Sequence, residues 1–176
     1  ELPGFSGEYG EQKRLFSLFS DLGISAVTYS HPPIFTVEQG TALDLPGNIS
    51  GQHGKSLFLV TPSGDLWLVV ACEDTRVDLK LLSRVLGMKR FSFAKPETMI
   101  EVLNVSPGSA TPFALLNDNH RRVRVVVEDR FRLSTHCVFH PLDNRYSTVI
   151  AVDDLFSFLR SLSIEPYILP LAGKDA

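Results

Sequence analysis

The apolar positions of this chain of 176 residues follow two different spacings, and the two alternate along the sequence. Between Leu15 and Leu22 the apolar residues lie on one side of a helix, and Gly23 follows as a helix stop. Ser56–Val60 and Leu66–Ala71 are apolar almost throughout, and turn-forming residues separate them, which predicts a hairpin. This alternation of helical and strand spacing is typical of a single α/β domain.

The predicted elements form one layered domain. The two hairpin strands are so apolar that we expect them near the centre of a sheet with both faces covered. The fold class is therefore α/β (α+β): a single domain whose mixed, mostly antiparallel sheet of about six or seven strands is surrounded by helices. Residues 11–171 form this domain, between a flexible N-terminal segment at 1–10 and a C-terminal tail at 172–176. Helices are predicted over 15–22, 36–43, 78–86, 96–102 and 154–162, and strands over 26–30, 56–60, 66–71, 113–116, 123–128, around 138, 147–151 and 167–169. Thr36 and Asp153 are expected to cap the second and the last of these helices.

Composition restricts what such a domain can bind. Seventeen Lys and Arg against twenty Asp and Glu give a formal net charge of −3 and a pI near 5.9. A protein that coats a nucleic-acid backbone is usually basic, because neutralising phosphates supplies most of that affinity. The composition therefore argues against DNA binding and against a long RNA footprint. It allows a small pocket that holds only the end of a nucleic acid.

Two further features concern where the chain works. The longest apolar run, Leu66–Cys72, has seven residues, whereas a spanning helix needs about 20, so no membrane crossing is expected. Cys72 and Cys137 lie far apart without metal-binding spacing, which favours a reduced, cytoplasmic chain over a disulfide framework. The first ten residues hold no apolar stretch, so no signal peptide is expected.

Candidate chemistry is sparse, because the sequence holds none of the usual nucleotide-binding, zinc-protease or serine-hydrolase fingerprints. Lys55 stands at the start of a buried strand, where it either extends into water or holds a phosphate or a polarised ester. The Gly108–Pro112 loop is either an ordinary turn or a set of backbone N–H groups facing an anion or a carbonyl oxygen. Ser56 and Ser109 have no histidine beside them in sequence, so nothing specific supports Ser/His/Asp catalysis.

Two histidines follow in the last third of the chain. His136 and His140 are four residues apart, so both would project from the same face of a strand. They could begin a metal site, but no third ligand at suitable spacing is evident, and we expect neither a metal nor a cofactor. His140 stands where a strand gives way to a turn, which suits a pocket residue. Asn144 is either a turn residue or a hydrogen-bonding partner across that pocket.

The basic residues form two small clusters, Lys89 with Arg90, and Arg121 with Arg122 and Arg124. Strand alternation places Arg122 and Arg124 on a solvent face, which is the simpler interpretation. The alternative is a surface that follows RNA phosphates, and the three arginines are then candidates to contact an acceptor stem.

Several segments stand in an order that points to a known family. They are His31–Glu38, Leu45–Gly47, Gly51–Leu59, Leu66–Val70, Val77–Lys80, Pro107–Leu115 and Phe139–Asn144. Together, over about Glu11–Leu171, they resemble the free-standing relatives of the bacterial prolyl-tRNA synthetase editing domain, the YbaK-type deacylases of alanyl-tRNA(Pro). The resemblance implies an α/β editing fold, no metal, and hydrolysis of the ester between a mischarged amino acid and the tRNA 3′ end.

The resemblance also implies roles for single residues. Lys55 matches a lysine associated with the terminal adenosine and with activity, Gly108 begins the family's Gly-x-x-x-Pro loop, and His140 matches a pocket histidine, so these three are the catalytic candidates. Family members commonly have Asn where this chain has Ser56 and Val138, and these departures concern amino-acid specificity. Substrate-binding candidates are Thr36, Val37, Ser56, Ser109, Ala110, Thr111, Pro112 and Asn144.

The leading hypothesis is a trans-acting deacylase whose partner is the aminoacylated 3′ end of tRNA(Pro), with prolyl-tRNA synthetase or an elongation factor as further candidate partners. Backbone N–H groups of Gly108–Thr111 would stabilise an oxyanion, Lys55 would hold the terminal adenosine, and the substrate's ribose hydroxyl would help to activate water. The alternatives are a non-catalytic module for a tRNA end or a synthetase, a deacylase of different specificity such as for cysteinyl-tRNA(Pro), and a metal hydrolase that uses His136 and His140.

Overall fold

The computed structural model describes residues 1–42 and 49–172, and the side chains of residues 37, 41 and 42 lie outside that description. The loop expected at Leu45–Gly47 therefore lies outside the described residues, as does most of the expected C-terminal tail. Ala172, the first residue of that tail, forms an isolated antiparallel bridge with Val77.

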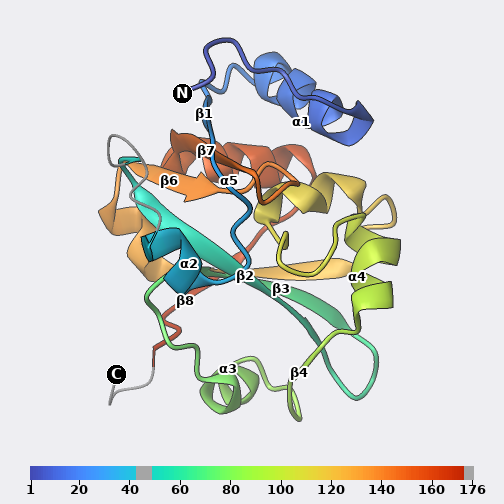
Figure 1. Ribbon diagram of the computed structural model, residues 1–176. Helices are drawn as coiled ribbons and strands as arrows, with labels where there is room; N and C mark the ends of the chain where they lie inside the picture. Colours follow the sequence, from blue (N-terminus) through green and yellow to red (C-terminus); the bar gives the residue numbers. More distant parts are fainter. Residues whose placement is uncertain (43–48, 173–176) are drawn as a thin grey trace.

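Within the described residues, eight strands form one mixed sheet in the order β1-β7-β6-β2-β3-β5-β8, and β4 pairs with β2 beside this path (Figure 1). Four strand pairings are antiparallel and three are parallel. The predicted mixed, mostly antiparallel sheet is confirmed, with one strand more than expected. The strands are β1 Val27–Ser30, β2 Gln52–Val60, β3 Leu66–Cys72, β4 Ser92–Phe93, β5 Val123–Glu128, β6 His136–Phe139, β7 Tyr146–Ala151 and β8 Tyr167–Leu169.

Helices cover the two faces of this sheet unequally. A large apolar core packs on one face, where Phe19 of α1, Leu103 of α4 and Phe158 of α5 meet around Phe113. A smaller cluster around Trp67 lies on the other face, beneath α3 (Figure 1). The helices are α1 Gly10–Asp21, α2 Val37–Ala42, α3 Leu79–Val85, α4 Pro96–Leu103 and α5 Val152–Ser161, with two 3₁₀ helices, η1 Pro112–Asn117 and η2 Asp129–Leu133.

The prediction of a strand at Phe113–Leu116 is wrong, because these residues lie in η1. Thr111 precedes this helix in an extended conformation, and its hydroxyl accepts a hydrogen bond from the Phe113 N–H at 3.3 Å. Pro112 then supplies the fixed φ angle that suits a first helical position. A short, fully buried apolar run has no periodicity that separates a strand from such a helix.

Two predictions about helix starts have different outcomes. Thr36 caps α2 as predicted, since its hydroxyl accepts a hydrogen bond from the Gln39 N–H at 3.2 Å. Asp153 does not cap α5, because that helix begins two residues earlier than predicted, after Ala151, and has no side-chain cap. Asp153 instead lies in the first turn, where a carboxylate interacts favourably with the helix dipole.

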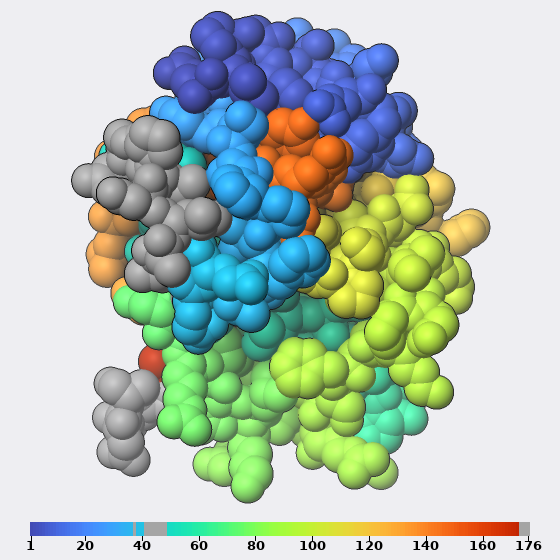
Figure 2. Space-filling view, in the orientation of Figure 1, coloured from blue at the N-terminus to red at the C-terminus, as the bar shows by residue number. Residues whose placement is uncertain are grey.

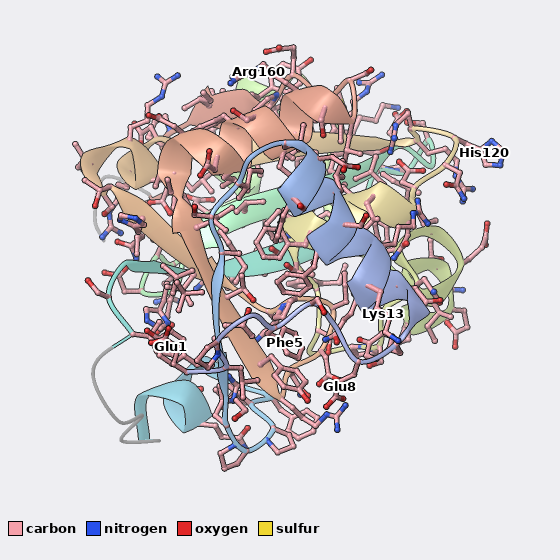
Figure 3. The ribbon with its side chains drawn as sticks, turned by 90° about the horizontal axis from the view of Figure 1, so that it is seen from above. Glu1, Phe5, Glu8, Lys13, His120 and Arg160 are labelled. Atoms are coloured by element: carbon pink, nitrogen blue, oxygen red, sulfur yellow. The ribbon has the colours of Figure 1, made fainter. Side chains whose placement is uncertain are left out.

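The N-terminal segment, expected to be flexible, lies against the domain in this structure. The Leu2 N–H donates to the Thr28 carbonyl at 2.7 Å, and the Phe5 ring stacks on Tyr146 with centroids 5.1 Å apart. Glu8 accepts a hydrogen bond from the Tyr146 hydroxyl at 2.5 Å, and Figure 3 shows Phe5 and Glu8 on the segment that runs alongside α1. These contacts join residues 2–8 to β1 and β7.

No helix in the described ranges combines the length and the apolar character needed to cross a membrane. Cys72 and Cys137 are both buried and carry free thiols. Burial raises the pKa of each thiol to about 12, so both stay protonated at neutral pH.

Candidate active site

In the described part of the sheet, one edge of β2 is paired only at its two ends, which leaves a gap. On that side β2 pairs with β6 through Gln52 and His53, and with β4 through Leu59 and Val60. Between these contacts, no described strand pairs with this edge of β2. The Ala94 N–H donates to the Phe58 carbonyl on this edge at 2.9 Å. Since alternate residues of a strand direct their backbone groups to the same side, those of Ser56 also point toward the gap.

A cavity of about 720 Å³ occupies this gap. Its volume falls in the range of about 300–1,000 Å³ that is usual for small-molecule sites. Figure 2 shows the teal surface of β2 recessed between the light-blue segment that leads into α2 and the yellow-green segments that flank α4. The cavity is lined by residues 34–36, 40, 49, 53–58, 73, 93, 94, 99, 107, 108, 110, 138–140 and 147.

The structure brings together about half of the predicted site residues. Thr36, Lys55, Ser56, Gly108, Ala110 and His140 line the cavity. Val37 opens α2, and its side chain is outside the described part of the structure. The other predicted residues, Ser109, Thr111, Pro112 and Asn144, support the site from positions that do not line the cavity.

Lys55 and Ser56 come from the open part of β2. Lys55 lies close enough to Glu38 and Asp74 to help lower the pKa of both carboxyls, although hydrogen bonds at each carboxyl are the larger cause. The Ser56 hydroxyl is buried and has no hydrogen-bond partner among the described residues. A lysine and an unsatisfied hydroxyl thus share one edge of the cavity, where they can meet polar groups of a ligand.

The Gly108 loop combines a required backbone shape with a close contact. Gly108 has φ +90°, a conformation that glycine adopts at low cost. An added Cβ would lie 3.5 Å from Cδ1 of Phe35, so this ring lies directly beside the loop backbone. The Ser109 N–H donates to the Ser106 carbonyl at 3.0 Å and is therefore engaged within the turn. Gly108 and Ala110 are the loop residues that face the cavity.

His140 is held as a neutral imidazole with a fixed tautomer. Its Nδ1 lies 2.7 Å from the Tyr146 carbonyl oxygen, which only accepts, so Nδ1 carries the proton. Burial lowers the pKa of His140 below its ordinary value of 6.5 and outweighs this hydrogen bond, which raises it. The Nε2 atom has no hydrogen-bond partner among the described residues, and its lone pair is available to accept a proton.

A second histidine, His31, lies beside His140 with ring centroids 6.0 Å apart. Its Nδ1 donates to the Pro32 carbonyl, and its Nε2 lies 2.8 Å from the Ser147 hydroxyl, which lines the cavity. When His31 is neutral, Ser147 is therefore the donor and Nε2 the acceptor. This contact joins the segment before α2 to β7. Sequence reasoning missed the pair because 116 residues separate its members.

Asn144 fastens the same two segments from outside the cavity. Its side-chain amide donates to the Ile34 carbonyl at 2.9 Å, and its own carbonyl accepts from the Ile34 N–H at 3.1 Å. Asn144 therefore forms its hydrogen bonds beside the pocket, where they hold the segment at Ile34 against the turn that follows β6. We call residues 138–147 with the docked segment 31–34 the histidine wall.

His136 and His140 do not act together. His136 is exposed at the start of β6 and pairs with the Thr135 hydroxyl at 3.0 Å, whereas His140 is half-buried in the cavity wall. Among residues 1–42 and 49–172, no cluster of three or more His, Cys, Asp or Glu side chains has the geometry to hold a metal ion.

Other cavity residues carried weak signals in the sequence. Gly54 lies in the interior of β2, and an added Cβ would overlap the Phe139 ring. A glycine inside a strand pattern often marks such a close approach, so this signal was present. Phe35 and Phe93, each 64% exposed, line the cavity from a loop and from β4. Phe35 lies within the His31–Glu38 segment of the family resemblance, whereas Phe93 belongs to none of those segments.

Comparison with known proteins agrees with this geometry. The family model of the aminoacyl-tRNA editing domain matches residues 31–158. The chain is 30% identical over 152 residues to the prolyl-tRNA editing protein ProX of Acetoanaerobium sticklandii, covering 85% of this chain and 91% of that protein. It is 32% identical over 160 residues to the prolyl-tRNA synthetase associated domain-containing protein 1 of Danio rerio, covering 90% of this chain and 86% of that protein.

The fold is also shared with a solved structure of a protein proposed to be a trans-editing enzyme for prolyl-tRNA synthetase. The two superpose with a TM-score of 0.71 at 17% identity, over 95% of this chain and 99% of the other. The class of protein is therefore a free-standing editing domain. The chain belongs to the aminoacyl-tRNA editing domain family, and editing of mischarged tRNA is its reaction class.

Proposed function

We propose that this protein hydrolyses mischarged aminoacyl-tRNA in the cytoplasm, with alanyl-tRNA(Pro) as its preferred substrate and alanine and free tRNA as products. The observation that carries the proposal is the cavity at the open edge of β2, which gathers Lys55, Gly108 and His140. The similarity to ProX, a prolyl-tRNA editing protein, supports the choice of tRNA. Prolyl-tRNA synthetase or an elongation factor is the candidate partner that delivers the charged tRNA.

In the proposed reaction, a water oxygen bonds to the aminoacyl carbonyl carbon, and the ester bond to the terminal ribose breaks. His140 Nε2 accepts the proton that the water loses and returns it to the leaving ribose oxygen, a role that suits a neutral histidine. The neighbouring ribose hydroxyl of the substrate helps to orient the water. No step requires a metal.

The cavity also offers groups for the developing charge and for the nucleotide. Backbone N–H groups at Gly108 and Ala110 stabilise the negative charge on the carbonyl oxygen. Lys55 binds the terminal adenosine or its phosphate by a charge-assisted contact. Loss of one oxyanion donor typically costs a factor of about 100–1,000 in rate.

Selection of the amino acid falls to the apolar part of the cavity, which Ile34, Met99 and Phe139 line. One methylene of difference gives only about 10–200-fold discrimination through lost contacts. Rejection of proline therefore requires that its ring overlaps a wall that alanine does not reach. Ser56 and Val138, which also line the cavity, are the residues at which a different preference, such as for cysteine, would arise.

The test is the release of alanine from charged tRNA(Pro) by the wild type and by Lys55→Ala, with Lys80→Ala as the matched control. Lys80 is an exposed lysine of α3 outside the cavity. We expect hydrolysis by the wild type and by Lys80→Ala, also after treatment with a chelator, and a loss of at least 100-fold in Lys55→Ala.

Other outcomes would contradict the proposal in distinct ways. Binding of charged tRNA without turnover would show a non-catalytic binding module, and loss of activity in chelator would show a metal hydrolase. Full activity of Lys55→Ala would remove the proposed role of this lysine. Faster release of cysteine than of alanine would contradict the proposed amino-acid preference and leave the proposed deacylation reaction intact.

A further inference from the structure

The segment 89–95, which contains β4, is the most basic exposed part of the cavity surroundings. Lys89, Arg90 and Lys95 are all exposed, and no acidic residue lies between them in sequence. Phe93, at the centre of this segment, is a large apolar side chain that is 64% exposed. We call residues 89–95 the basic strip. Three exposed cations thus flank an exposed aromatic residue in sequence, in a chain whose net charge is −3.

The cations of the basic strip have no internal partner within residues 1–42 and 49–172. Over the described residues, Lys89, Arg90 and Lys95 form no ion pair and no side-chain hydrogen bond. The other basic cluster differs, because its guanidinium groups are already engaged. Arg121 donates to the Leu115 and Asp118 carbonyls, Arg122 pairs with Glu101 at 3.2 Å, and Arg124 lies over the Trp67 ring at 5.5 Å.

The basic strip is continuous with the cavity. Phe93 and Ala94 line the cavity, and β4 is fixed to β2 by the pairing of Phe93 with Leu59. Phe35, equally exposed, lines the same cavity and lies beside Gly108. A ligand whose end enters the cavity can therefore extend over the Phe93 ring and reach the cations on both sides of it.

We propose that the basic strip binds the single-stranded 3′ end of the RNA substrate, with a nucleobase stacked on Phe93 and the backbone phosphates beside Lys89, Arg90 and Lys95. The proposal rests on the proposed function, since it assigns the nucleotides that precede the one held in the cavity. Base stacking on an exposed aromatic ring tolerates any sequence, and cations along the strand neutralise its phosphates.

The assignment changes which residues are expected to contact RNA. The sequence directed attention to Arg121, Arg122 and Arg124, because their density of charge is highest. Their internal contacts make them weaker candidates, since each guanidinium already has a partner that holds it in place, whereas the cations of the basic strip have none among the described residues. Phe93 gave no signal in the sequence because a two-residue strand has no periodicity.

The experiment measures binding of a fluorescently labelled single-stranded RNA oligonucleotide that ends in CCA, by anisotropy over a range of salt concentrations. Phe93→Ala is expected to weaken binding about tenfold, the low end for one stacked base. The triple variant Lys89→Gln, Arg90→Gln, Lys95→Gln is expected to reduce the slope of log K against log salt by roughly 2, at about 0.7 per phosphate contact.

The matched controls are Leu133→Ala and Arg132→Gln in η2. Leu133 is an exposed apolar residue and Arg132 an exposed cation, and neither lines the cavity. Both controls are expected to bind as the wild type does. Equal weakening by Phe93→Ala and Leu133→Ala, an unchanged salt slope in the triple variant, or no binding by the wild type would overturn the proposal.

Hydrolysis separates this proposal from the proposed function. With alanyl-tRNA(Pro), the triple variant Lys89→Gln, Arg90→Gln, Lys95→Gln is expected to raise KM about tenfold and leave kcat unchanged. With alanine esterified to adenosine alone, which ends within the cavity, the triple variant is expected to match the wild type, because none of its three cations lines the cavity. If the wild type hydrolyses neither substrate but the oligonucleotide results hold, the proposed function fails and the RNA-binding strip stands. An equal loss on both substrates in the triple variant would show that its effect arises within the cavity and would overturn the strip.

Discussion

The histidine wall and the basic strip line the same cavity, yet they are built in opposite ways. In the histidine wall, the side chains of His31, His140 and Asn144 each make a short hydrogen bond to a backbone carbonyl at 2.7–2.9 Å. In the basic strip, only Phe91 is buried, against Trp67, while Lys89, Arg90, Phe93 and Lys95 are exposed, and β4 pairs with β2 over two residues. Precise chemistry requires fixed groups, whereas stacking and charge contacts tolerate movement. The difference supports the two proposals, with catalysis at the wall and RNA docking at the strip.

The variant His140→Gln should have the largest effect and tests whether the histidine wall contains the catalytic base. We expect a loss of about 100-fold or more in kcat, since general-base catalysis typically contributes about 100–10,000-fold. The pH profile gives a second readout. Because burial lowers the His140 pKa below 6.5, the neutral base persists at neutral pH, and wild-type kcat should fall only as the pH drops below that value.

The control for this prediction is His136→Gln, four residues earlier and exposed. It is expected to keep both the rate and the acidic fall in kcat, whereas His140→Gln should lose that fall. If the two variants behave alike, the wall does not contain the base.

The pKa of His140 also predicts how stability depends on pH. In the unfolded chain this histidine binds a proton near pH 6.5, and in the folded chain only at lower pH. The unfolded state therefore holds more protons as the pH falls below about 6.5, and the contribution of the neutral, buried ring to stability is lost there. Chemical denaturation of the wild type should show a decrease in stability between pH 6.5 and 5 that is smaller in His140→Gln.

Gly54→Ala should have the next largest effect, because Gly54 joins the wall to β2. The added methyl group would overlap the Phe139 ring, which packs against Phe113 and Phe131 in the core. We expect a loss of about 1–3 kcal/mol in the free energy of unfolding, the usual cost of overpacking. Urea denaturation measures it, with Gly10→Ala as the control, since no atom lies within 4 Å of a Cβ there. A loss in Gly10→Ala equal to that in Gly54→Ala would show that the Phe139 contact is not the cause.

Much of the sheet can be predicted from the sequence alone, and the features that cannot be predicted have physical causes. The predicted hairpin of β2 and β3 is confirmed. Its two long apolar runs, separated by turn residues, are compatible with few other structures. The helical form of Phe113–Leu116 was missed, since burial of all its residues removes the periodic signal. The Asn144–Ile34 and His31–Ser147 contacts cross more than 100 residues, so no local pattern reveals them. Resemblance to a family supplied Lys55, Gly108 and His140, whereas Phe93 became evident only from its exposure and position.

Arg122→Gln should have the smallest effect. It tests whether the basic strip, and not the arginine cluster, contacts the RNA. Its partner Glu101 is an exposed residue of α4, and exposed ion pairs contribute about 0–1 kcal/mol. We expect a change in unfolding free energy of less than about 0.5 kcal/mol and less than a twofold change in binding of the CCA oligonucleotide. Lys95→Gln, which removes a cation with no partner among the described residues, should weaken that binding more than Arg122→Gln does. If Arg122→Gln weakens binding of the oligonucleotide more than Lys95→Gln does, the RNA contacts the arginine cluster and not the basic strip. Arg122 would then bind RNA in preference to its partner Glu101, which requires that it face the bound strand.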